Sequence, residues 1–180
     1  MQKVIGIIGP IASGKDSTAA YIATKTGAPI YQISAEITKI AIERKIPIER
    51  SHLIELSREL TREHGDDFLT RRLLQQHAEP TIILVGMRQI GQIEYLRKNA
   101  SLLLIGITAD EKTRFQRVLQ RKKEGDPDSI ESFKEIETQD DGPFAQKVST
   151  CMEMADRIIV NEGSLSELEN EIDRALVHQK

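Results

Sequence analysis

The sequence predicts an α/β fold in which helices cover both faces of a parallel sheet. Two observations lead to this prediction. Short β-branched runs alternate with segments of helical periodicity, and the first run ends in a glycine-rich turn that opens a helix. The chain has 180 residues, the usual size of one domain, so we treat residues 1–180 as a single domain.

Five short apolar runs are predicted as strands. They cover residues 3–8, 30–33, 81–85, 102–107 and 157–160. The runs at 81–85 and 102–107 are uninterrupted, which is typical of strands at the centre of a parallel sheet.

Helices are predicted between these strands, at 14–26, 36–44, 92–98, 110–122 and 164–177, with two more between 51 and 77 that break near Gly65. The last helix should be capped by Ser164, with Glu167 three residues on. The polar stretch 123–141 is the best candidate for a mobile segment.

Composition excludes several classes of function. The net charge is −3 and the pI is near 5.9, so a surface built to attract nucleic acid is not expected. Cys151 is the one cysteine, which rules out an intramolecular disulfide and a multi-thiolate metal site. No run approaches the ~20 apolar residues of a membrane span, so we expect no membrane partner and a cytoplasmic protein. The four histidines lack a metal-ligand spacing: His52, His64, His77 and His178.

The strongest chemical signal lies between the first predicted strand and the first predicted helix. Gly9-Pro-Ile-Ala-Ser-Gly14-Lys15 fits the P-loop pattern G-x-x-x-x-G-K, with a strand before it and a helix after it. Such glycines let the backbone curl around a polyphosphate, and the helix N-terminus adds a positive dipole end. We predict that ATP binds here and that Lys15 reaches its β- and γ-phosphates. The candidate nucleotide-binding residues are Gly9, Ala12, Ser13, Gly14, Lys15, Asp16 and Ser17.

Asp16 departs from this pattern, because the usual Ser or Thr at that position supplies a hydroxyl to Mg²⁺. A carboxylate can also hold Mg²⁺, directly or through water. Asp16 is therefore the candidate metal ligand.

Further motifs carry a family resemblance. Together with Val85-Gly86-Met87-Arg88 and residues 112–115 and 155–164, the P-loop resembles an uncharacterised family of adenylate-kinase-related and dephospho-CoA-kinase-like proteins, best known from archaea. The resemblance covers nearly the whole chain. The Ser-Gly-Lys-Asp form of the loop is also similar to that of viral deoxynucleoside monophosphate kinases and animal phosphomevalonate kinases.

This resemblance implies a three-layer P-loop NTPase fold of the nucleoside monophosphate kinase type. Its helical acceptor-binding region would span about 36–77 and its lid about 122–143. The implied activity is phosphate transfer from ATP, with Mg²⁺, to a small nucleotide acceptor, with AMP as the first candidate and a deoxynucleotide as the second. Asn161 and Gly163 would lie near adenine.

Arginines complete the implied site. The candidate catalytic residues are Lys15, Arg88, Arg117 and Arg121. Arg114 shares the helical spacing of Arg117 and Arg121. The candidate acceptor ligands are Glu36, Arg62 and Arg88, and weaker candidates are Arg58 and Arg71. The arginines are candidates because a guanidinium can bind phosphate through two hydrogen bonds. The alternative for the helical arginines is a solvated helix face.

Two departures from the family pattern keep alternatives open. Val85 stands where the family has an acidic residue, and the acidic stretch 136–141 stands where its lid carries arginines. Phosphoryl transfer depends on charge around the γ-phosphate, so both departures bear on activity. The alternatives are a dephospho-CoA kinase, a degenerate kinase that binds ATP as a regulator without transfer, and, with less support, an RNA-processing ATPase. The oligomeric state is not predicted.

Overall fold

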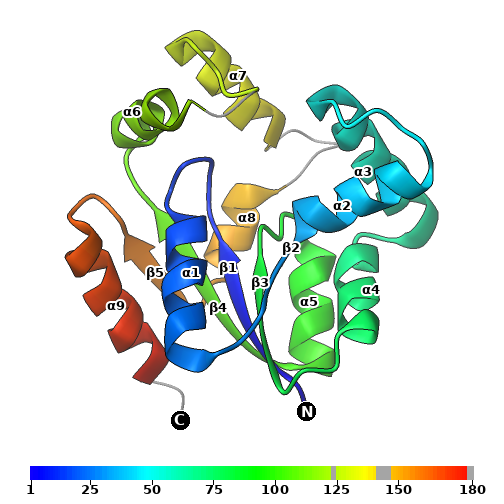
Figure 1. Cartoon of the computed structure of the whole chain (residues 1–180), viewed down its shortest axis with the longest axis horizontal. Helices are drawn as coiled ribbons and strands as arrows, with labels where there is room; N and C mark the ends of the chain where they lie inside the picture. The colour runs from blue at the N-terminus through cyan, green and yellow to red at the C-terminus, as the bar shows by residue number, and fades with distance from the viewer. Residues whose placement is uncertain (123–124, 141–146, 178–180) are drawn as a thin grey trace.

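The computed structural model describes residues 1–122, 125–140 and 147–177. In this part of the chain, five parallel strands form one sheet in the order β2-β3-β1-β4-β5 (Figure 1). They are β1 (Lys3–Ile8), β2 (Ile30–Gln32), β3 (Thr81–Val85), β4 (Ser101–Thr108) and β5 (Arg157–Val160). The predicted α/β class and parallel sheet are confirmed.

Strand β1 lies at the centre of the sheet. Its Ile5 pairs with Ile83 of β3 on one side and with Leu103 of β4 on the other. Five of its six residues are buried, because helices cover both faces of the sheet. This position fixes where the loop after Ile8 leaves the sheet.

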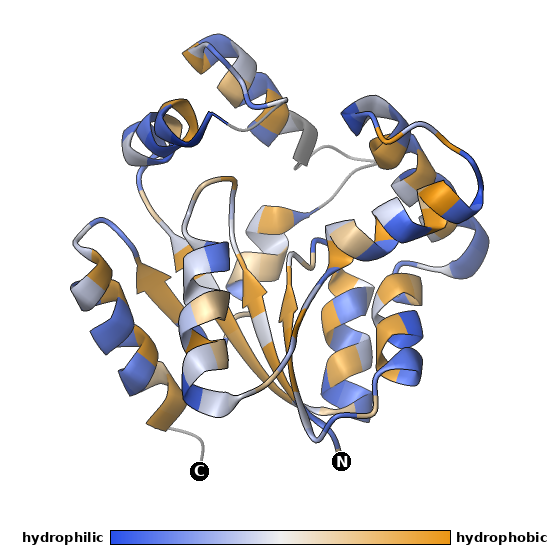
Figure 2. Cartoon of the chain, in the orientation of Figure 1, coloured by the Kyte–Doolittle hydropathy of each residue, from blue (hydrophilic) through white to orange (hydrophobic). Residues whose placement is uncertain are grey.

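The helices form a layer on each side. On one face, α1 (Lys15–Thr26) and α9 (Leu165–Val177) pack Ile22 and Ile172 against Ile5. On the other face lie α4 (Phe68–Gln76), α5 (Ile90–Asn99) and α8 (Val148–Glu153), with Leu96 and Cys151 in the core (Figure 2). Cys151 is thus a packing residue.

Two groups of helices lie beyond the carboxyl ends of the strands, one on each side of the loop after β1 (Figure 1). One group contains α2 (Ile33–Glu43) and α3 (Arg50–His64), which come between β2 and β3. The other contains α6 (Glu111–Arg121) and α7 (Ile130–Asp140), which come after β4. In open α/β sheets, ligands bind at this end of the strands.

Helix α7 differs from the expectation for 123–141, where no helix was predicted. Its one fully buried side chain among those described is Phe133, whose ring lies 5.5 Å from that of Phe115. Ser129 caps the helix, because its hydroxyl accepts a hydrogen bond from Ser132 N at 3.1 Å. A single aromatic anchor within a charged segment is too weak a signal for a prediction from periodicity. Residues 123, 124 and 141 lie outside the described part of the chain, as does the end of the predicted lid.

The C-terminal helix agrees with its predicted cap. Ser164 N donates to Glu167 Oε2 at 2.7 Å, and Glu167 N donates back to Ser164 Oγ at 3.3 Å.

Among the helices that the structure describes, none combines the length and the apolar character required to cross a bilayer.

Candidate functional site

The P-loop connects the end of β1 to the start of α1. Three of its residues have positive φ: Gly9 at +149°, Ala12 at +57° and Gly14 at +109°. A Cβ at Gly9 would lie 2.1 Å from the Ile107 carbonyl oxygen, so only glycine fits there. Ala12 in the left-handed region is a strained position of the kind found where a backbone is shaped for a ligand.

Asn161, which follows β5, holds this loop in place. Its Nδ2 donates to the Ser13 carbonyl at 2.8 Å, and its own backbone N donates to the Thr108 carbonyl at 2.7 Å. A Cβ on Gly14 would lie 2.2 Å from Asn161 Nδ2, so the amide and the glycine fit each other closely. The structure places the Asn161 side chain against the loop backbone. That Asn161 lies near adenine, as the resemblance implied, stays a prediction.

The loop fits a polyphosphate on two observations. Ser13 is fully buried, and its Oγ has no hydrogen-bond partner among the described residues. Lys15 Nζ donates to the Pro10 carbonyl at 2.7 Å, which holds the ammonium over the loop. A buried polar atom without a partner is costly, and phosphate oxygens are suitable partners for such groups.

A cavity of about 1440 Å³ opens in front of this loop. Its lining includes Ala12, Gly14, Lys15, Asp16 and Ser17 on the loop side and reaches to α2, α3, α6 and the end of β3. Pockets for drug-sized ligands measure about 300–1,000 Å³, so this cavity has room for a nucleotide and a second molecule.

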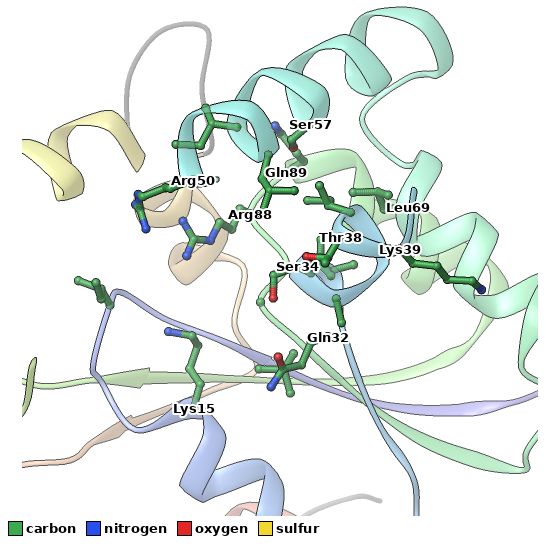
Figure 3. A pocket seen from close by; sticks show the side chains of 18 of the residues that line it. Lys15, Gln32, Ser34, Thr38, Lys39, Arg50, Ser57, Leu69, Arg88 and Gln89 are labelled. Atoms are coloured by element: carbon green, nitrogen blue, oxygen red, sulfur yellow. The ribbon is translucent and has the colours of Figure 1, made fainter. Parts of the chain in front are cut away.

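Two arginines extend into the same cavity from different elements. Arg88 follows β3, and its backbone N donates to Gln92 Oε1 at 2.8 Å; Arg50 is the first residue of α3. Figure 3 shows both side chains above Lys15, which projects toward them from the start of α1. Three cationic groups are thus gathered in one region.

The end of β3 lacks the acidic residue of the resembled family. Val85 stands there, buried, and lines the cavity. Within 1–122, 125–140 and 147–177, no three His, Cys, Asp or Glu side chains form a group that could hold a metal ion. Asp16 is exposed in the lining, and its Oδ1 accepts a hydrogen bond from Gln32 Nε2 at 3.2 Å. A carboxylate in this position suits Mg²⁺ bound jointly with phosphate oxygens.

Helix α6 brings two of its predicted arginines to the cavity. Arg117 Nη2 donates to the Asn161 carbonyl at 2.8 Å, while its Nη1 is buried with no partner among the described residues. Arg121 forms two hydrogen bonds of 2.6 Å with the Asp126 carboxylate. These bonds to Asp126, with a smaller contribution from the charge of Asp16, raise the pKa of Arg121 above its ordinary value.

Arg114, the first of the three, is buried beneath the loop rather than in the cavity lining. It donates to the Ala109 carbonyl at 2.9 Å and to the Ile11 carbonyl of the P-loop at 3.4 Å. It also forms an ion pair with Glu137 of α7, and its guanidinium lies 5.4 Å from the Phe133 ring. Glu137 of the acidic helix α7 therefore neutralises an arginine that contacts the P-loop.

Several predicted acceptor residues lie outside the cavity lining. Glu36 is buried in an ion pair with Arg72 of α4, whose Nε lies 2.6 Å from its Oε1. Arg62 is 71% exposed and lies 3.3 Å from Glu55. Two weaker candidates are also paired with acidic neighbours: Arg58 with Glu55 and Arg71 with Asp67. Gly163 lies in the turn before α9, outside the lining, where a Cβ would meet Glu167 at 2.3 Å.

Arg50 was missed by the sequence analysis, although its neighbours hold a signal. The residues three and four positions away from it are Ile46, Pro47, Leu53 and Ile54. None of these can neutralise a guanidinium, whereas Arg58 has Glu55 at helical spacing. An arginine at a helix start without such an acidic neighbour is a candidate anion ligand.

Comparison with solved structures identifies the fold. The shikimate kinase of Acinetobacter baumannii, in complex with shikimate, is similar over the whole of this chain and 96% of its own, with a TM-score of 0.61 and 15% identity. At this identity the similarity concerns the fold alone, which is that of P-loop kinases.

Sequence comparison gives relatives over almost the full chain, although no protein-family model matches it. A UPF0200/UPF0201 protein of Archaeoglobus fulgidus is 30% identical over 98% of this chain, which spans about half (55%) of that relative's length. A UPF0200 protein of Hyperthermus butylicus is 31% identical over 176 residues, covering 96% of this chain and 92% of that relative. Because this identity extends over almost all of both sequences, the chain belongs to the UPF0200 family.

Proposed function

We propose that this protein is an ATP-dependent phosphotransferase that transfers the γ-phosphoryl group to a small anionic acceptor. The observation that carries the proposal is one cavity in which the P-loop Lys15 faces Arg50 and Arg88. The likeness to a kinase supports it at the level of the fold. ATP is a cytoplasmic metabolite, so the proposal also places the protein in the cytoplasm.

Different residues of the chain would bind ATP, hold the metal ion and bind the acceptor. The loop N–H groups and Lys15 bind and orient the β- and γ-phosphates, and Arg117 and Arg121 lie where they can offset charge that develops during transfer. Mg²⁺, when bound, would neutralise charge on the same phosphates, and Asp16 is the residue that would hold it. Arg50 and Arg88 would grip the acceptor so that its attacking oxygen lies in line with the γ-phosphorus.

The resemblance makes nucleoside monophosphates the first acceptors to test, with AMP ahead of deoxynucleotides and dephospho-CoA. The experiment follows phosphate from labelled ATP·Mg²⁺ into each acceptor. Transfer to any of them, at a rate above ATP hydrolysis alone, supports the proposal. ATP binding without transfer to any acceptor would favour a regulator, the alternative that Val85 at the end of β3 supports.

Replacing Arg50 or Arg88 by alanine should raise the KM for the acceptor about tenfold or more. The physical reason is the loss of a charge-assisted hydrogen bond to an anion, which contributes about 1.5–3 kcal/mol. The affinity for ATP, measured by titration, should stay within about twofold of the unmodified protein. Arg62→Ala is the matched control, because Arg62 is exposed and outside the lining. Equal effects of the Arg62 and Arg88 variants would contradict this assignment.

Replacing Asp16 by alanine should weaken the Mg²⁺ dependence of ATP binding about tenfold, since one carboxylate near the metal is lost. Isothermal titration of ATP at several Mg²⁺ concentrations measures this change. Glu49→Ala serves as the comparison, because Glu49 also lines the cavity but lies at the start of α3. An unchanged Mg²⁺ profile for Asp16→Ala would exclude Asp16 as the metal ligand.

A further inference from the structure

The part of the cavity under α2 and α3 has an apolar wall. Ile37, Ile42, Ile48, Leu53 and Ile54 all line it. Ile42 is 59% exposed and Ile48 is 57% exposed, although both belong to the inner surface of a cavity. Covering such side chains removes apolar surface from water and is favourable, so this wall suits a ligand with an apolar body.

The two threonine side chains in the same region already form hydrogen bonds within the protein. Thr38 Oγ1 donates to the Ser34 carbonyl at 2.9 Å, and Thr61 Oγ1 donates to the Ser57 carbonyl at 2.9 Å. Both hydroxyl protons therefore serve the backbone of their own helices. The remaining hydroxyls of this wall, among residues that the structure describes, are Ser34 and Ser57.

The two glutamines beside Arg88 are committed as well. Gln92 is buried, and its Oε1 accepts hydrogen bonds from the backbone N of Arg88 at 2.8 Å and of Gln89 at 3.1 Å. The Gln89 side chain completes the reciprocal capping box at the start of α5. The acceptor oxygens of both amides thus already serve the start of α5, whereas reading the edge of a nucleobase requires paired donors and acceptors.

An aromatic platform for a base is also lacking in the described lining of this wall. Phe68 is its aromatic residue, and the Phe68 ring packs on His64 at 4.6 Å between centroids. The other wall residues are aliphatic, carry short polar groups, or are charged. Of the charged ones, Lys39 (Figure 3) donates from its Nζ to Gln76 Oε1 at 3.4 Å, and Glu43 forms an ion pair with Arg72. A site that recognises a substrate by hydrogen bonds discriminates strongly, and this wall offers few of them.

We propose that the acceptor is an aliphatic monophosphate rather than a nucleotide. Its phosphate lies on Arg50 and Arg88, and its alkyl or hydroxyalkyl body lies against Ile42 and Ile48. The inference rests on the proposed function and names the acceptor for it. An oxygen of the acceptor phosphate dianion attacks the γ-phosphorus, a new P–O bond forms, and the bond from the γ-phosphorus to the β–γ bridging oxygen breaks. ADP leaves with that electron pair, the product is an alkyl diphosphate, and no proton changes place.

The test compares n-butyl and n-hexyl phosphate with AMP, CMP and dTMP as acceptors of labelled phosphate from ATP·Mg²⁺. We expect kcat/KM for the alkyl phosphates to exceed that for each nucleotide at least tenfold. Ile42→Asn should lower kcat/KM for the alkyl phosphates about tenfold and leave the affinity for ADP unchanged. Leu165→Asn is the matched control, because Leu165 is 62% exposed and lies at the start of α9, outside the cavity.

The outcomes distinguish failure of this inference from failure of the proposed phosphotransferase function. Preferred transfer to AMP that is insensitive to Ile42→Asn would overturn the inference and leave the phosphotransferase proposal intact. Absence of transfer to every acceptor would overturn both. Binding of n-hexyl phosphate can be measured without turnover, as the shift in Tm that it causes when ADP is present. Equal binding by the unmodified protein and Ile42→Asn would count against the apolar wall as its site.

Discussion

Replacing Lys15 by alanine is expected to lower the rate of phosphoryl transfer by a factor of about 10²–10³, the effect of losing one good electrostatic contact to the transition state. The ammonium is already oriented by the Pro10 carbonyl at 2.7 Å, so little reorganisation is needed when ATP binds. Single-turnover measurements with labelled ATP separate this chemical step from product release. Affinity for ADP should fall much less, because the loop N–H groups remain.

Lys25→Ala is the control for this experiment, because Lys25 lies on the same helix, is half exposed and pairs with Asp173 of α9 rather than with the loop. Its transfer rate should match that of the unmodified protein. A Lys15→Ala variant that retains more than a third of the original rate would show that the P-loop lysine does not stabilise the transferring group.

Replacing Arg114 by alanine should lower the free energy of unfolding by about 3 kcal/mol. Removing one partner of a buried ion pair costs about 3–5 kcal/mol, and the 24% exposure of Glu137 places this pair at the lower end of that range. The Ala109 and Ile11 carbonyls would also lose their guanidinium donor. Urea unfolding followed by circular dichroism measures the change.

A second variant separates charge from packing in that network. Arg114→Met keeps most of the side-chain volume against Phe133 but leaves Glu137 without its partner, so most of the loss should remain. Arg174→Ala, which removes an exposed pair with Glu171, should change stability by less than about 1 kcal/mol. If Arg114→Ala proved no more damaging than Arg174→Ala, the contacts that join α7 to the P-loop through Arg114 would not contribute to stability.

The fold and the loop could be predicted because their signals are local. Val4, Ile5, Ile7 and Ile8 form a buried strand in any context that covers both faces, and glycines at 9 and 14 mark the turn. Strand followed by G-x-x-x-x-G-K followed by helix is a pattern within some twenty residues, so no knowledge of tertiary contacts was needed.

The remainder of the site depends on contacts between distant residues. Glu36 was expected to face the acceptor, but Arg72, 36 positions later, pairs with it. Glu137 reads as a misplaced negative charge in sequence, and only the position of Arg114, 23 residues earlier, shows what it neutralises. Such pairings are set by how helices pack, which a single sequence does not display. Helix packing also decides which residues line the cavity with Arg50, Val85 and the apolar wall, so their grouping could not be predicted from sequence.

The position of β1 has a consequence for how the chain is made. Its two neighbours in the sheet begin at Thr81 and Ser101, and the amide that secures its loop belongs to Asn161. During synthesis, the residues that form the P-loop emerge first, yet the strand before them cannot complete its pairing until more than half the chain has followed. A growing chain should therefore acquire the ability to retain a nucleotide late and in one step, after β5 has left the ribosome.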